Sequence, residues 1–289
     1  MILNWKKGVE KMINTLEHGS FKKIKPLLLG LENHPVINGV IDENNPGEIF
    51  VDNLIHPETA FIWAKNEMFY LCGKVDNQEF NSELEEYIAS VIRVEALPEE
   101  DTLNLEIHPN HEWDRSIESI FTRVALLKGE RVPFRFHKDW FNRTHTKEVP
   151  EGYEVKPISR ELVAWDAGHI IKNEIMKFWG ESLESFFHKG LGYAVVHGQN
   201  VIGTCLSVFV SKNDYEIGIN TYDPCHRGKG LATAMARAFI EECLRRDVTP
   251  HWTTESFRKD SIVIAKKVGF EQLDNYPVYY LPFEEFVIK

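Results

Sequence analysis

The chain has 289 residues, 43% of them hydrophobic and 27% charged, with a formal net charge of −11 at pH 7. This composition is typical of a folded globular protein, and the length favours two domains or one large one. The acidic charge argues against a nucleic-acid partner, because no strong basic field would attract phosphates.

The four cysteines are scattered along the chain and none belongs to a C-x-x-C pair; they are Cys72, Cys205, Cys225 and Cys243. A disulfide framework or a zinc site is therefore not expected, and a reducing cytoplasm fits best. The sequence also lacks an apolar run of about 18 residues, so we expect neither a signal peptide nor a membrane partner.

The first half of the chain predicts a mixed set of helices and strands. The first thirty residues have the apolar spacing of an amphipathic helix. Residues 82–96 open with Ser82 as N-cap and Glu85 at the capping-box position, which predicts a second helix. Further elements are expected as a strand at 47–53, a hairpin over 60–75, a strand at 102–108, a short helix at 114–122 and a strand at 130–137.

The second half begins after a polar stretch, residues 137–152, which we interpret as a linker. It separates a mixed α/β N-terminal domain, residues 1–145, from a C-terminal domain, residues 150–289. In the second domain we expect strands starting at Tyr153 and at 192–198, 201–211, 215–221, 250–254 and 276–281, and helices at 160–178, 231–246 and 260–268.

The most informative segment is residues 215–233, where an alternating strand ends near Pro224 and a glycine-rich turn opens a helix. Glycines let the backbone approach an anion closely, and the helix dipole adds positive potential. Arg227 and Lys229 add charge, so pyrophosphate is the natural guest. The segment has neither G-x-x-x-x-G-K-[ST] nor the third glycine of G-x-G-x-x-G. An ordinary tight turn is the alternative.

The pattern Arg227-x-x-Gly230-x-Ala232, between a strand and a helix, resembles the R/Q-x-x-G-x-G/A signature of the GNAT acetyltransferase superfamily. The resemblance covers about residues 153–283. Together with Pro250-x-Trp252 and Gly269-Phe270, the segment is similar to the GNAT subfamily that includes zwittermicin A resistance proteins.

This resemblance implies an α/β (α+β) fold with a strongly bent mixed sheet in the C-terminal half, and acetyl-CoA (coenzyme A) as co-substrate. It implies that the pyrophosphate binds the backbone of the turn and that the pantetheine arm lies along the preceding strand. The implied cofactor-binding residues are Ile219, Asn220, Thr221, Arg227, Gly228, Lys229, Gly230, Leu231, Ala232, Thr233 and Arg258.

The catalytic candidates are Glu216 and Ser261. Glu216 is either a general base or a solvent-facing or ion-paired strand residue. Arg258 stands where many family members have Asn, and Ala265 stands where many have a general-acid Tyr. The acid is therefore left open between Ser261 and water, or one of three tyrosines: Tyr276, Tyr279 and Tyr280.

The substrate candidates are Trp179, Glu181 and Ser182, because a glycine and two polar residues directly follow an aromatic cluster. Core packing is the alternative for these aromatics. Ligand-type side chains also occur at Glu106, His108, His111 and Asp114, but Pro109 breaks the spacing and no second half follows. We therefore expect a solvated loop there and no metal.

The predicted function is transfer of an acetyl group from acetyl-CoA to a primary amine of a small molecule, such as an antibiotic or a metabolite, by direct attack. Two alternatives stay open: a non-catalytic acyl-CoA sensor, motivated by Arg258 and Ala265, and acetylation of protein N-termini or lysines. The N-terminal domain could cap the acceptor cleft, form a homodimer or stabilise the fold.

Overall fold

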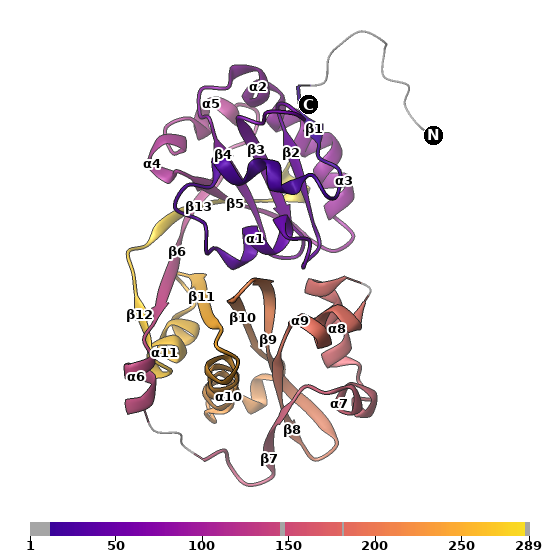
Figure 1. The fold of residues 1–289 in the computed structure, drawn as a ribbon, viewed down its shortest axis with the longest axis vertical. Coiled ribbons are helices and arrows are strands. Elements are labelled where there is room, and N and C mark those ends of the chain that lie inside the picture. Colours follow the sequence, from indigo (N-terminus) through magenta and orange to yellow (C-terminus); the bar gives the residue numbers. More distant parts are fainter. Residues whose placement is uncertain (1–11, 145–147, 181, 287–289) are drawn as a thin grey trace.

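The computed structural model describes residues 12–144, 148–180 and 182–286, and it places them in two lobes (Figure 1). The strands are β1 (Asn14–Thr15), β2 (Gly47–Val51), β3 (Thr59–Ala64), β4 (Met68–Gly73), β5 (Thr102–His108), β6 (Leu127–Phe136), β7 (Tyr153–Pro157), β8 (Gly192–His197), β9 (Asn200–Ser211), β10 (Asp214–Thr221), β11 (Thr249–Glu255), β12 (Phe270–Gln272) and β13 (Tyr276–Pro282). The helices are α1 (Pro35–Ile41), α2 (Gln78–Tyr87), α3 (Arg93–Ala96), α4 (Asn110–Trp113), α5 (Ile117–Ile120), α6 (Lys138–Arg143), α7 (Arg160–Trp165), α8 (Ile170–Trp179), α9 (Leu183–Lys189), α10 (Leu231–Arg246) and α11 (Lys259–Lys267).

Within these ranges the strands form one mixed sheet in the order β1-β2-β3-β4-β5-β13-β6-β11-β10-β9-β8-β7, and β12 pairs with β6. The order has a repeat in it. Each lobe has an antiparallel series, β2-β3-β4 or β8-β9-β10, followed by a helix and a parallel strand, β5 or β11. The two lobes therefore share one topology.

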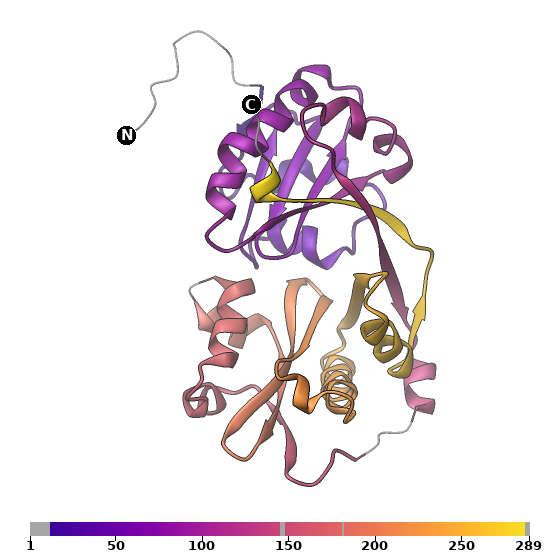
Figure 2. The same ribbon diagram turned by 180° about the vertical axis from the view of Figure 1, so that it is seen from behind.

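The last strand of each lobe comes from the other half of the chain. β6 follows the first lobe in sequence but pairs with β11, whereas β13 is the last described strand and pairs with β5. β6 and β13 also pair with each other, with Pro277 opposite Glu130. Figure 2 shows the two strands passing between the lobes along one side. The predicted boundary around residues 145–150 divides the chain into two consecutive halves. The strand pairing crosses this boundary, because each lobe includes a strand from the other half.

The apolar core also crosses between the halves. One buried cluster joins Val40 and Ile62 of the first lobe to Phe209 and Phe239 of the second. A second cluster lies in the first lobe, where Phe61, Phe69 and Phe80 pack with Trp113 and with Phe283 after β13. Burial of so many large side chains supplies most of the favourable free energy of folding. No helix within the described ranges is long and apolar enough to cross a membrane.

Asn45 is a polar joint between the lobes. The pairing of β9 with β10 shifts by one residue, so that Val208 is left without an opposite residue. Asn45, 5% exposed, donates to the carbonyls of Val208 (2.8 Å) and Phe178 (2.9 Å) and accepts the Val210 N–H (3.0 Å). A bulge leaves backbone groups unpaired, and this side chain from the first lobe satisfies them.

Most strands and the hairpin lie where the sequence predicts them, whereas three helix predictions need correction: residues 82–96 are helical as predicted but with another N-cap and start, and the other two helix predictions are wrong. Residues 12–20 include β1 and a turn, and only 21–27 form a short 3₁₀ helix; residues 1–11 lie outside the described ranges. α2 starts at Gln78 because Asn77, not Ser82, accepts the Phe80 N–H (3.3 Å). Glu85 instead accepts hydrogen bonds from Arg123.

The third error concerns the helix expected over 160–178, which is broken into α7 and α8. Asp166 accepts the Ile171 N–H (2.8 Å), and His169 adopts a left-handed φ of 54°. A side chain that bonds nearby backbone competes with continued helix. The linker predicted over 137–152 also contains a helix, α6; residues 145–147 lie outside the described ranges.

We expect Asn45→Ala to lower the free energy of unfolding by about 2–3 kcal/mol, because buried backbone groups of β9 lose their partners. Urea denaturation measures the change, and Asn275→Ala at an exposed site serves as the control. Equal stability of the two variants would contradict this role of Asn45.

Candidate active site

A wedge opens between β10 and β11. The two strands pair in parallel only from Asp214 to Glu216, opposite Thr249 to His251. Beyond this point β11 pairs with β6, from Trp252 to Glu255, while β10 continues along β9 as far as Thr221. The β11-facing edge of β10 after Glu216 therefore has no strand partner in the described part of the chain. An extended ligand arm could bind along it through backbone hydrogen bonds.

The end of this wedge is the glycine-rich turn. Gly228 and Gly230 have φ values of 76° and 82°, and an added Cβ at either position would meet no heavy atom within 4 Å. Gly230 is the N-cap of α10, a 16-residue helix with no side-chain cap and no acidic residue in its first turn. Open space, outward N–H groups and the helix dipole make this end a good anion site.

The two cations predicted to assist binding lie on this turn. Arg227 and Lys229 are exposed and held by backbone carbonyls, Arg227 Nε to Thr221 O at 3.1 Å and Lys229 Nζ to Cys225 O at 2.6 Å. Asp223 accepts the Cys225 N–H at 2.8 Å and closes the short turn before them. The geometry thus gathers positive potential at one end of the wedge.

The other predicted cofactor residues distribute along β10 and the start of α10. Ile219, Asn220 and Thr221 lie on the part of β10 that pairs with β9 but no longer with β11. Ala232 and Thr233 are half-buried in the first turn of α10, and Leu231 is 2% exposed, so only its backbone can meet a ligand. Arg258 bonds Asp260 at the start of α11 (3.2 Å), and no contact of the described residues joins it to the turn.

At the other end of the wedge, between the lobes, is a cavity of about 420 Å³. This volume is in the range of small-molecule sites. Both halves of the chain line it: Gly30 to Pro35, Ile37, Tyr70, Glu106, Ile107 and His108 from the first, and Pro133, Phe134, Glu216, His251 to Thr253 and Tyr276 from β6 and the second.

Glu216 lies in the wall of this cavity and is 6% exposed. Its Oε1 accepts the Thr253 N–H at 3.0 Å, and the described residues form no ion pair with it. Burial raises the pKa of Glu216 to about 7, the Glu67 carboxylate adds to the increase, and His251 and Arg131 oppose it. The carboxyl is therefore buried, neither solvent-facing nor ion-paired, and close to half-ionised at neutral pH.

The remaining predicted site residues do not line the cavity. The buried Ser261 Oγ accepts the Trp252 Nε1–H at 3.0 Å. Trp179 is 4% exposed, donates from Nε1 to the Ser207 carbonyl at 2.9 Å and packs edge-on against Phe186, as a core residue does. Ser182 is exposed at the start of α9. Glu181 lies outside the described residues.

Sequence reasoning missed the contribution of the first half to the cavity. Glu106 was expected in a solvated loop, yet it lies on β5 and is 7% exposed. The sequence did indicate that Glu106 lies on a strand, because alternation places Glu106 and His108 on the face opposite Leu105 and Ile107. What that face meets depends on the other lobe. No group of the described residues could hold a metal ion.

A buried guanidinium lies behind the cavity. Arg131, 6% exposed on β6, contacts Glu255 (2.9 Å), Glu106 (3.3 Å) and Glu67 (3.6 Å). The three carboxylates come from β11, β5 and the β3–β4 turn. Burial raises the pKa of Glu106, and Arg131 counteracts the increase. The surroundings of the cavity are acidic because one cation faces these three carboxylates as well as Glu216.

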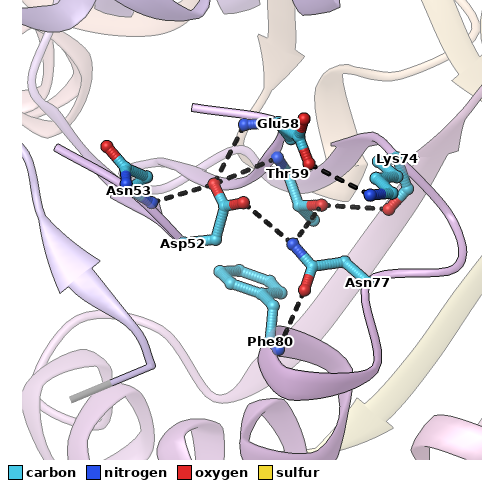
Figure 3. A network of polar contacts seen from close by, with 7 residues as sticks. All are labelled: Asp52, Asn53, Glu58, Thr59, Lys74, Asn77 and Phe80. Carbon is cyan, nitrogen blue, oxygen red and sulfur yellow. Dashed lines mark hydrogen bonds and ion pairs between the residues drawn. The ribbon is translucent and has the colours of Figure 1, made fainter. Parts of the chain in front are cut away.

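The first lobe has a strand–turn–helix at the topologically equivalent place, β4 to α2, but it forms no comparable site. β4 and β5 stay paired from Phe69 to Cys72. Figure 3 shows that its own side chains fill the turn. Asp52 accepts from Asn77 (2.9 Å) and the Thr59 N–H (3.2 Å), and Asn77 caps α2. A carboxylate at this place would repel a phosphate.

Comparisons with known proteins identify the family of this chain. A sequence model of the family described as GNAT acetyltransferase matches residues 25–279, and the chain belongs to that family. It is an acyltransferase family whose members use acetyl-CoA. The uncharacterized N-acetyltransferase YdfB of Bacillus subtilis (strain 168) is 26% identical over 248 residues, which cover 84% of this chain and 89% of YdfB.

Solved structures share the fold. A GCN5-related N-acetyltransferase-like protein from Streptococcus suis 89/1591 superposes with a TM-score of 0.65 at 20% identity, covering 90% of this chain and 98% of that one. A tandem GNAT protein from the clavulanic acid biosynthesis pathway gives 0.57 at 12% identity, covering 94% and 98%. The α/β (α+β) GNAT fold predicted from the sequence is confirmed.

We expect Gly230→Glu to abolish the binding of coenzyme A, because a carboxylate would occupy the open space at the N-terminus of α10. Gly19→Glu is the matched control, since Gly19 has the same φ of 82° and an equally open surrounding. Calorimetric titration with coenzyme A measures both. Unchanged affinity in Gly230→Glu, or equal loss in both variants, would contradict the assignment.

Proposed function

We propose that the protein transfers the acetyl group of acetyl-CoA to a primary amine of a small molecule. The observation that carries the proposal is the position of Glu216, in the cavity wall at the point where β10 and β11 separate. From this residue to Thr221 the strand spans roughly 17 Å and ends at the glycine-rich turn. An extended arm anchored at the turn would bring its thioester to the cavity.

The chemistry needs an acceptor nitrogen with a free electron pair. In the proposed step the amine attacks the thioester carbonyl, the C–N bond forms, the amine proton passes to Glu216, and the C–S bond breaks as the thiolate leaves and takes a proton from water. Glu216 Oε1 is bonded to Thr253, which leaves Oε2 to meet the amine. Unpaired N–H groups along β10 would stabilise the oxyanion.

The proposal has three further parts. The cytoplasmic location is supported by four free cysteines, three of them buried. Ser261 is the alternative to water as the acid; its hydroxyl accepts the Trp252 Nε1–H at 3.0 Å and does not line the cavity. The homodimer stays a prediction.

Acetyl-CoA binding can be tested by thermal unfolding and calorimetry. We expect one acetyl-CoA per chain, because the first lobe's counterpart of the turn is filled by its own side chains. A donor at about 100 times its Kd stabilises the folded protein by about 2.7 kcal/mol. An unfolding temperature that does not change at millimolar acetyl-CoA would contradict the proposal. Binding of two acetyl-CoA molecules per chain would contradict the conclusion that the first lobe has no such site.

For the Glu216→Gln variant we expect turnover to fall by about 10²–10⁴-fold, because the amide cannot accept the amine proton. In the native protein, kcat/KM should decline below about pH 7, where the carboxyl is protonated, and this limb should be absent from the variant. Initial rates against pH measure both. Glu118→Gln, on the exposed surface, is the control.

The same variant should change the pH dependence of stability. Glu216 titrates near 7 in the folded chain against an ordinary 4.5, so its protonation favours folding. That contribution is complete below about pH 4.5 and is lost as the pH rises through 7. Glu216→Gln should therefore be more stable than the native protein above pH 7, by urea denaturation. Equal stability at pH 8 would contradict the buried, unpaired carboxylate.

A further inference from the structure

The wall of the cavity, as far as the chain is described, carries acidic groups and histidines but neither Lys nor Arg; of the histidines, His251 is paired with Asp214 (2.7 Å). Three acidic side chains line it, Glu32, Glu106 and Glu216, and none of the described residues in the lining is Lys or Arg. The cation behind the wall, Arg131, already contacts three carboxylates. Such a site attracts cationic ligands and repels anionic ones. The lining therefore favours an acceptor that carries positive charge in addition to its reacting amine.

The Glu106 carboxylate can accept a hydrogen bond from a ligand. Its Oε1 accepts the Tyr276 hydroxyl at 3.0 Å and lies 3.3 Å from Arg131 Nε, whereas no donor among the described residues reaches its Oε2. The residue is 7% exposed and lies in the cavity wall. A carboxylate oxygen in so little water favours a charged donor strongly.

Glu106 and Glu216 lie on different lobes, on β5 and β10. Burial raises the pKa of each carboxyl, and the positive charge of Arg131 opposes the increase. The cavity lining also includes aromatic rings, Tyr70 and Trp252 among them. Such rings suit a hydrocarbon stem and also stabilise a nearby cation. The cavity lining thus has a carboxyl from each lobe together with aromatic side chains.

Resting on the proposed function, we propose that the acceptor is an amine with a second basic group, and that Glu106 selects it. Glu216 takes the proton of the reacting amine, and Glu106 holds the second, protonated nitrogen. The class is that of alkyl diamines and longer amino-bearing cations. Amino acids are excluded from it, because their carboxylate would enter an acidic cavity.

Alkyl diamines of increasing chain length test the proposal against alkyl monoamines and ω-amino acids of matched length. We expect kcat/KM for the best diamine to exceed that for its monoamine by about 10–100-fold, the factor of one charge-assisted hydrogen bond. The gain should lie mainly in KM, and ω-amino acids should be the poorest acceptors. Equal values for diamine and monoamine would overturn the proposal.

Glu106→Gln should reduce the diamine-to-monoamine ratio about tenfold or more. Glu67→Gln is the matched control, because Glu67 contacts the same Arg131 but does not line the cavity. It should retain the native ratio. If both variants lose the preference equally, Glu106 acts through Arg131 and the assigned contact is wrong.

Calorimetric titration of the diamine without donor gives a readout that does not depend on turnover. Binding that weakens in Glu106→Gln but not in Glu67→Gln supports the site, and absence of diamine binding to the native protein overturns it. The proposed function fails separately, by the absence of acetyl-CoA binding. An enzyme that binds acetyl-CoA and acetylates monoamines as well as diamines retains its function and loses only this inference.

Discussion

The contacts of Arg131 hold the two lobes in the arrangement on which the site depends. Its strand, β6, lies between β13 and β11, and at Arg131 the two opposite residues are Tyr276 and Glu255. Its guanidinium reaches carboxylates of both lobes. A buried cation is costly unless it is paired. The pairing is complete only when both lobes and both exchanged strands are in place, so this residue ties the cavity to the global fold.

The exchange of β6 and β13 explains why the cavity belongs to neither lobe. If each lobe kept its own last strand, β5 and β11 would end separate sheets. Because the strands cross, Glu106 on β5 and Glu216 on β10 come to face one cavity within one sheet. Asn45 adds a second joint, inserted at the bulge of β9. The cavity, which we propose to hold the acceptor, is thus a product of the interface, as many ligand sites are.

The two lobes also show how one topology supports different uses. β10 and β11 separate after Glu216 and leave a wedge, whereas β4 and β5 stay paired. The turn before α10 is open around Gly228 and Gly230, whereas Asp52, which follows β2, is hydrogen-bonded to Asn77 in the turn before α2. One lobe has the open turn that we propose as an anion site, and the other contributes walls and charges to the cavity.

The sequence by itself determined the family and most local elements of the second lobe, the break between α7 and α8 excepted. The Arg227–Ala232 turn and the strand and helix beside it act over short distances, so their residues specify them directly. Glu216 stood out for the same reason, as an acid on the strand before the turn. The burial and the raised pKa of Glu216 could not be predicted from the sequence, because they depend on packing and on charges distant in sequence, such as Glu67.

Only the tertiary structure decided the partner of each exchanged strand and the makeup of the cavity. Nothing local in residues 276–282 says that they pair with β5, since pairing depends on which edge is free. The same holds for Trp179, which the sequence offered as a substrate contact and the fold buries in the core. Local residues specify turns and periodicity, whereas what a side chain faces is set by packing between segments far apart in the chain.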